Sequence, residues 1–376
     1  MPNNSLLGSP QLARFLCWNL AKNVPSLPIQ RPTWLPKYLP ELDGLRGLAI
    51  LAVILYHCHP RLRGTVLYPA ALWGWSGVTL FFVMSGLLIT AGLLEMRDQP
   101  RYFHNFHARR ILRIWPVYLL VLAFVYAEAP WYIGQSVWEA VRSAPWWAYL
   151  LFLQNLFPLA LPPALGPTWA LAIEEQYYFV WAPLVRWLRS PAILAFPPLL
   201  ALIVSPLVRH AHPHWITPTH TLIHLDGIAF GSLLAICLYT LRLSQRIWLW
   251  IGLACLAGGI AAAASIAGGT AYLDTALAFA YGGAVLSSIA STSAVTPLHA
   301  VLRRGPLAFY GRISYGLYMV HISVFIFFGW FDVKMDPYGV PGNLAVVVFR
   351  LAVATLVATV LWYGLEKPIL RLKRYF

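Results

Sequence analysis

Apolar stretches about as long as a bilayer is thick recur along most of this chain. A helix of about 20 apolar residues crosses the hydrocarbon core of a membrane. Lipid offers backbone groups no hydrogen-bond partner, so each stretch is predicted to be helical. The candidate spans are 43–60, 74–95, 110–128, 168–188, 191–208, 221–241, 247–267, 271–291, 307–331 and 342–365. The sequence therefore predicts an all-α integral membrane protein with about ten transmembrane helices around a polar cavity.

The composition excludes a water-soluble fold. Hydrophobic residues make up 59% of the 376 residues and charged residues only 11%, too few to cover a surface in water. Residues 41–368 are predicted to form one membrane domain. Residues 1–40 are read as a proline-rich cytoplasmic tail and 369–376 as a basic cytoplasmic C-terminus. The apolar stretch 145–157 is too short to cross and is expected to be re-entrant or interfacial.

The basic residues predict which side of the membrane each loop occupies. With ten spans, most of the 27 Lys and Arg residues fall on one side. Positive charge collects on the cytoplasmic side of membrane proteins, so both termini are expected in the cytoplasm and the protein in the cell (inner) membrane. The same rule accounts for the net charge of +14 without a nucleic-acid partner. Nothing in the sequence indicates an oligomeric state.

Ionisable residues inside the predicted spans are candidate site residues, because a charge in lipid is costly unless it faces a cavity or a partner. Their depths are expected to bring them together near the outer half of the bilayer, where imidazoles and carboxylates suit acid and base chemistry. The candidates are His57, His321, Glu174, Glu175 and Asp226. Adjacent residues on a helix point about 100° apart, so one glutamate is expected in the cavity, and Glu175 is favoured. Structural hydrogen bonding would explain Asp226 and His321 equally well.

Arginines near the inner boundary form a second candidate group. Arg46 and His57 lie on one helical face, and their axial separation of about 16 Å is comparable with the reach of an extended pantetheine arm. Arg110 and Arg113, next to Arg109, also share a helical face. Guanidinium groups suit phosphates, although ordinary positive-inside anchoring would also explain these charges.

Several segments together resemble the membrane-bound acyltransferase-3 family, whose members O-acylate sugars of cell-surface glycans and some small molecules. The chain opens this pattern with YLPELDGLRGLAI (38–50), which leads to His57. The further segments are FFVMSGLLIT (81–90), FHARRILRIWPVY (106–118), TWALAIEEQYYFVWAPL (168–184), GRISYGLYMVH (311–321) and EKP (366–368). The resemblance covers about residues 38–374.

The resemblance implies roles for individual residues. Arg46 and His57 correspond to the family's Arg/His pair, with His57 essential, and Arg110 and Arg113 to its cytoplasmic arginine pair. Glu174 or Glu175 occupies the acidic motif. The family often carries an arginine immediately before the aspartate at 226, where this chain has Leu225, so Asp226 is expected to have lost a charge partner.

The resulting hypothesis is a transmembrane O-acyltransferase. Acyl-CoA, with acetyl-CoA favoured, is expected to bind from the cytoplasm, and His57 to act as base or nucleophile toward a hydroxyl of a glycan acceptor. The alternative is a transporter or proton-coupled carrier, which would also use buried charges. The histidines of segment 209–214 offer a weak metal-site reading, and no metal is expected. Arg350, deep in the last span, is expected to pair with a carboxylate.

Overall fold

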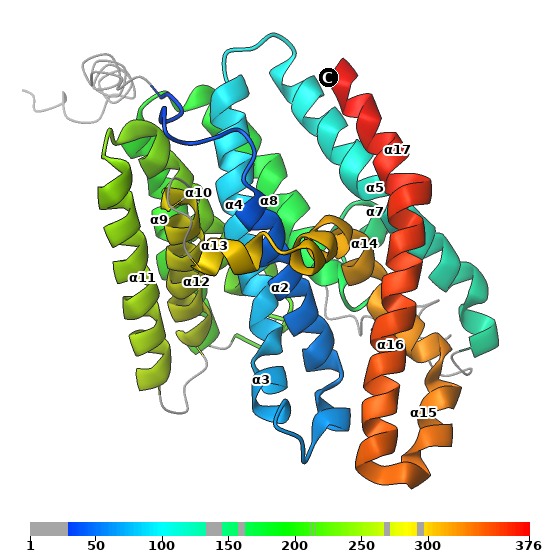
Figure 1. Ribbon diagram of the computed structural model, residues 1–376. Coiled ribbons are helices and arrows are strands. Elements are labelled where there is room, and N and C mark those ends of the chain that lie inside the picture. Colours follow the sequence, from blue (N-terminus) through cyan, green and yellow to red (C-terminus); the bar gives the residue numbers. More distant parts are fainter. Residues whose placement is uncertain are drawn as a thin grey trace, which may run out of the picture.

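The computed structural model describes residues 29–132, 145–156, 162–211, 213–214, 216–266, 271–291 and 297–376. Most of the predicted cytoplasmic tail (1–28), the end of the predicted re-entrant stretch (Phe157) and His212 lie outside the described residues. Within these ranges the chain is helical throughout and has no strand, which confirms the all-α prediction (Figure 1).

Each predicted span coincides with a helix. The helices are α2 (Pro40–His57), α4 (Gly77–Met96), α5 (Tyr102–Tyr132), α8 (Thr168–Trp187), α9 (Pro191–Ala211), α10 (Leu225–Thr240), α11 (Gln245–Ser265), α12 (Leu273–Ala290), α14 (Gly305–Phe327) and α16 (Gly339–Leu361). The shorter α3 (Tyr68–Leu72), α7 (Trp146–Leu150), α13 (Pro297–Leu302), α15 (Gly329–Met335) and α17 (Lys367–Leu370) connect or extend them. The span predicted at 307–331 is divided between α14 and α15, where Gly329 weakens helix continuity.

Six of the described helical segments are long and apolar enough to cross a membrane by length and composition. The others that match predicted spans are α2, α8, α10 and α14. Among these, α2 carries three charges within 18 residues and α10 has only 16 residues. A transmembrane helix with charged residues that face a cavity has a lower mean hydropathy, so it can fail a test based on apolarity. The total of ten spans therefore stays a prediction.

The stretch predicted to be re-entrant contains α7, whose five residues are too short to cross a bilayer. The turn after α7 is held by buried amides. Gln154 Nε2 donates to the Thr168 carbonyl at 3.1 Å, and Asn155 Nδ2 donates to the Thr219 carbonyl at 3.1 Å. These bonds satisfy backbone groups at the start of α8 and in the segment that precedes α10.

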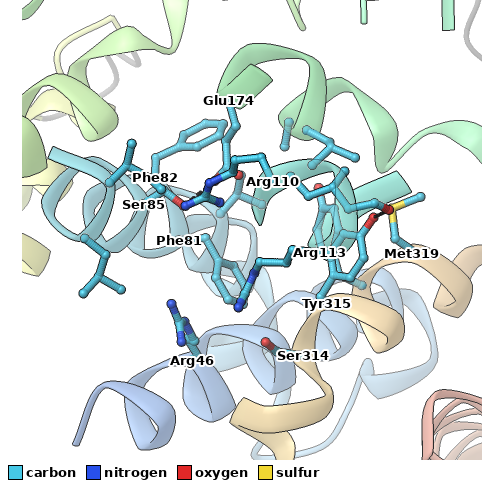
Figure 2. A pocket seen from close by; sticks show the side chains of 17 residues that line it. Arg46, Phe81, Phe82, Ser85, Arg110, Arg113, Glu174, Ser314, Tyr315 and Met319 are labelled. Atoms are coloured by element: carbon cyan, nitrogen blue, oxygen red, sulfur yellow. Dashed lines mark hydrogen bonds between the residues drawn. The ribbon is translucent and has the colours of Figure 1, made fainter. Parts of the chain in front are cut away.

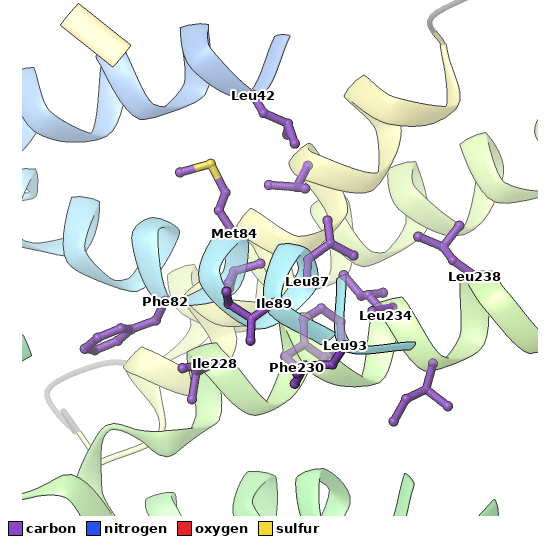
Figure 3. Packing of buried hydrophobic residues seen from close by; sticks show 14 of the residues in the cluster. Leu42, Phe82, Met84, Leu87, Ile89, Leu93, Ile228, Phe230, Leu234 and Leu238 are labelled. Carbon is purple, nitrogen blue, oxygen red and sulfur yellow. The ribbon is translucent and has the colours of Figure 1, made fainter. Parts of the chain in front are cut away.

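Lipid is the expected solvent for the outer helices. Large apolar side chains of α9 and α11 face outward, and Phe196 and Trp250 are 64% and 65% exposed. On the inside, α4 and α10 interdigitate along a continuous apolar seam (Figure 3). Gly86 and Gly231 lie in this seam, and a Cβ at either position would overlap a backbone carbonyl of the other helix. Small residues allow such close approach between membrane helices.

Helices α2 and α14 also cross through glycines. A Cβ at Gly47 would overlap the Leu307 carbonyl, and one at Gly311 would overlap the Asp43 carbonyl. His57 and His321, each ten residues farther along its helix, contact each other as well. The two helices therefore run in the same direction and stay adjacent over about 15 Å. This packing determines where both histidines lie.

The substitution Gly311→Ala is expected to destabilise the protein even though alanine favours helix by about 1 kcal/mol. The added methyl group would force α2 and α14 apart, and overpacking of this kind costs about 1–3 kcal/mol. Thermal unfolding of the purified protein in detergent measures the effect. The control is Gly92→Ala in α4, where a Cβ meets no atom within 4 Å. Equal midpoints for the two variants would contradict the proposed close crossing.

Candidate functional site

A cavity of about 290 Å³ lies between α2, α4, α5, α8 and α14, and we call it the arginine cavity. Its lining residues are Arg46, Val78, Phe81, Phe82, Ser85, Leu88, Ile89, Arg110, Arg113, Ile114, Ala170, Leu171, Glu174, Ser314, Tyr315, Tyr318 and Met319. Figure 2 shows the guanidinium groups of Arg46, Arg110 and Arg113 entering this space from α2 and α5. The cavity therefore collects the three arginines that the sequence pattern placed near one boundary.

These arginines lack matched carboxylates. Within the described chain, neither Arg110 nor Arg113 forms an ion pair, and Arg46 reaches Asp43 only at 3.5 Å. The Arg110 guanidinium lies over the Tyr178 ring at 4.8 Å. The cavity's one carboxylate, Glu174, accepts a hydrogen bond from Ser85 Oγ at 2.6 Å. Three cations facing one carboxylate leave a positive site suited to an anionic ligand with phosphate-like oxygens.

A second cavity of about 440 Å³, the histidine cavity, adjoins the first. Its lining residues are Val53, Tyr56, His57, Trp75, Val78, Thr79, Phe82, Gly166, Pro167, Trp169, Pro218, Thr219, His224, Asp274 and Tyr318. Val78, Phe82 and Tyr318 line both cavities, so their side chains separate the two spaces. Helix α2 contributes Arg46 to one cavity and His57 to the other.

The hydrogen bonds of His57 define which of its nitrogens is available. Its Nδ1 lies 2.9 Å from the Val53 carbonyl, and because a carbonyl only accepts, Nδ1 carries the hydrogen. His321 Nδ1 likewise donates to the Tyr318 carbonyl at 2.7 Å, which leaves His321 Nε2 as an acceptor 3.4 Å from His57 Nδ1. The tautomers, assigned from these bonds, agree with each other. They leave His57 Nε2 with a free lone pair, as a base or nucleophile requires.

His321 itself is fully buried and does not line either cavity. Its ring contacts that of His57, with centroids 4.9 Å apart. His321 therefore contacts His57 from outside both cavities.

The sequence predicted a single outer cavity for the buried acids and histidines, whereas the structure divides them. Glu174 lines the arginine cavity, while His57 and His224 line the histidine cavity. Glu175, which the sequence reasoning favoured, lines neither, and its buried Oε1 has no hydrogen-bond partner among the described residues. The rotation of α8 about its axis thus turns Glu174 toward the arginines. Packing against the neighbouring helices sets this rotation.

Asp226 is buried outside both cavities in an ion pair. Arg209 Nη2 lies 2.6 Å from Asp226 Oδ2, and Thr275 Oγ1 donates to the same oxygen at 2.7 Å. Arg209 also donates to the Ala271 carbonyl at 2.6 Å. The expectation that Asp226 had lost its charge partner was wrong, because Arg209 of α9 is that partner.

Three further expectations concern Arg109, Arg350 and a possible metal site. Arg109 is exposed, donates to the Phe376 carbonyl at 2.8 Å and does not line the arginine cavity. Arg350 pairs with Asp332, which confirms the expected carboxylate partner. Among the residues that the structure describes, no cluster of three or more His, Cys, Asp or Glu side chains could hold a metal ion.

Sequence reasoning missed Asp274, which lines the histidine cavity from the first turn of α12. A signal for it was available. Asp274 is an ionisable residue inside the predicted span 271–291, the same criterion that selected Asp226. Ser85, the partner of Glu174, carries no charge and offered no comparable signal.

Comparison with known proteins gives a consistent family. A family model described as an acyltransferase domain matches residues 39–363. The peptidoglycan O-acetyltransferase OatA of Listeria monocytogenes is 33% identical over 172 residues, which cover 42% of this chain and 26% of that protein. The O-acetyltransferase OatA of Staphylococcus aureus is 28% identical over 365 residues, which cover 89% of this chain and 57% of that protein. The chain thus spans less than two thirds of these relatives, and no solved structure matches it.

The Arg209–Asp226 pair predicts a large stability effect. Asp226→Leu would leave a buried guanidinium without its main partner, and breaking a buried pair costs about 3–5 kcal/mol. The double variant Arg209→Met/Asp226→Leu is expected to recover most of the lost thermal stability. Unfolding midpoints in detergent measure both, with Asp98→Asn, an acid that is 73% exposed, as control. If the double variant is no more stable than Asp226→Leu alone, the lost stability does not come from an unpaired Arg209 guanidinium.

Proposed function

The chain belongs to the acyltransferase family whose domain model matches residues 39–363, and on this premise we propose that it is a membrane O-acetyltransferase. It transfers an acetyl group from acetyl-CoA, bound from the cytoplasmic side, to a hydroxyl of a carbohydrate acceptor. The observation that carries the proposal is the pair of adjoining cavities, one with three arginines and the other with His57. The names of the relatives, both O-acetyltransferases, support the acetyl group.

The arginine cavity suits the donor's anionic end. Coenzyme A carries phosphates, which Arg46, Arg110 and Arg113 would bind through charge-assisted hydrogen bonds. Because three arginines share the cavity with one lining carboxylate, Glu174, binding an anion would relieve their mutual repulsion. The axial distance from Arg46 to His57, about 16 Å, allows the arm of the donor to extend from one cavity toward the other.

The histidine cavity suits the transfer step. His57 Nε2 takes the proton of the acceptor hydroxyl, whose oxygen attacks the thioester carbonyl. The carbon–sulfur bond breaks, an ester carbon–oxygen bond forms, and the proton passes to the departing thiolate. In the covalent version, the Nε2 lone pair attacks the thioester carbonyl, the carbon–sulfur bond breaks and the thiolate departs from an acetylated imidazolium. The acceptor hydroxyl then takes the acetyl group, the carbon–nitrogen bond breaks, and the hydroxyl proton neutralises the thiolate. The thioester would pass between Val78, Phe82 and Tyr318 to reach His57 in either case.

The transporter alternative has less support. Buried charges could serve an ion path, but the family match is to an acyltransferase domain and covers most of the chain. Acceptor-dependent release of CoA from acetyl-CoA by the reconstituted protein would separate the two functions. A transporter would release none.

Arg113→Met is expected to weaken CoA binding. Loss of one charge-assisted hydrogen bond costs about 1.5–3 kcal/mol, which corresponds to a rise in Kd of about tenfold or more. Isothermal titration of the purified protein with CoA measures it. The matched control is Arg189→Met, which removes an exposed arginine paired with Asp98 at 2.6 Å. An unchanged Kd in Arg113→Met would argue against the arginine cavity as the donor site.

His57→Ala is expected to lower acetyl transfer by about 100-fold or more, because it removes the base or nucleophile. The Kd for CoA should stay unchanged. His59→Ala is the matched control, since His59 lies two residues away and lines neither cavity. Near-normal transfer by His57→Ala would rule out both versions of the mechanism. Rapid-quench labelling with radioactive acetyl-CoA distinguishes them, because only the covalent route leaves a label that disappears in His57→Ala.

A further inference from the structure

The histidine cavity has a charge character opposite to that of the arginine cavity. None of its described lining residues is a Lys or Arg, and Asp274 is its only carboxylate. The two spaces share three lining residues, so they are adjacent but would attract ligands of different charge.

The Asp274 carboxylate lacks a close partner. Its Oδ2 is 3.7 Å from Arg209 Nη1 and 3.9 Å from His224 Nδ1, beyond hydrogen-bond length. Its Oδ1 is buried and has no hydrogen-bond partner in the described part of the chain. The nearby Arg209 is already bound to Asp226 at 2.6 Å. Because Asp226 and Asp274 share the Arg209 guanidinium, the Asp274 carboxylate can still accept a hydrogen bond from a further donor.

Aromatic side chains line the same cavity. Trp169 packs beside His224, with ring centroids 4.8 Å apart, and Tyr56 and Trp75 also face the space. Trp169 comes from the first turn of α8 and Asp274 from the first turn of α12, so both lie at the starts of helices that enter the membrane from this side. Aromatic faces offer apolar contact with polar edges, and a few placed polar groups fix ligand orientation.

From these observations we infer that the histidine cavity binds an uncharged, hydroxyl-rich acceptor, such as a neutral sugar ring, with Asp274 accepting a hydrogen bond from one of its hydroxyls and Trp169 packing against its face. The inference rests on the proposed function and adds to it the charge class of the acceptor. An anionic sugar would meet a carboxylate that shares the Arg209 guanidinium with Asp226, in a cavity whose described lining contains no Lys or Arg. A volume of about 440 Å³ falls within the range of about 300–1,000 Å³ common for small-ligand sites.

The test is direct binding to the full chain in detergent, with two probes of equal length. An N-acetylglucosamine tetramer is neutral, and a galacturonic acid tetramer is anionic. The wild type is expected to bind the neutral tetramer at least tenfold more tightly. Asp274→Asn should weaken that binding about tenfold or more, because it replaces a charged acceptor with a neutral amide. Asp98→Asn, which removes an exposed acid outside both cavities, should leave it unchanged.

Trp169→Leu supplies a second reading if Asp274→Asn folds poorly, and it should also weaken binding of the neutral tetramer. Equal binding of the two probes, no binding of the neutral tetramer, or wild-type affinity in both cavity variants would overturn the inference. Failure of the proposed function looks different. In that case the neutral tetramer binds and responds to Asp274→Asn, but no acetyl group reaches it from acetyl-CoA.

Discussion

The constraint on which this structure depends is that an unpaired guanidinium cannot face hydrocarbon. Arg46, Arg110 and Arg113 lie on helices that otherwise pack through apolar side chains. Among the described residues, the cavity lining holds one carboxylate, Glu174, and Asp43 approaches Arg46 only at 3.5 Å. A charge in lipid costs about 3 kcal/mol or more on insertion scales, so the three must share a polar space that opens to water or to a ligand. The arginine cavity is that space, and the surrounding helices have to leave it open.

Helix α2 carries Arg46 into the arginine cavity and His57 into the histidine cavity. Its glycines let it pack closely against α14 near Arg46, and the close packing continues to the contact between His57 and His321. One helix therefore fixes the distance between Arg46 and the His57 imidazole. His321 Nε2 contacts the His57 ring at Nδ1, so the tautomer assigned from these bonds leaves His57 Nε2 with its lone pair free. The site depends on helix packing more than on any loop.

The sequence predicted the helices and the residue types of the site, but not how the residues divide between cavities. Apolar length predicted a stretch that overlaps each of the long helices, and Arg110 and Arg113 were expected on one face from spacing alone. Depth along a helix does not give its rotation, so Glu174 and Glu175 were assigned in the wrong order with respect to the cavity. Asp226 was read as unpartnered because its partner, Arg209, is 17 residues away and belongs to another helix. Contacts between helices of this kind leave no local pattern in the sequence.

The opposite charge of the two adjoining cavities affects on which side of the partition each ligand would bind. The proposed anionic donor would be attracted to the arginine cavity and repelled by Asp274. The proposed neutral sugar would gain nothing from the arginines, and on the other side it would meet the Asp274 carboxylate and aromatic faces. Only the uncharged acetyl thioester end of the donor can pass the partition of Val78, Phe82 and Tyr318 without an electrostatic penalty. The fold would thus keep the nucleotide on one side of the partition and the product ester on the other, so that acetyl transfer across the membrane would require no movement of the charged nucleotide through the partition.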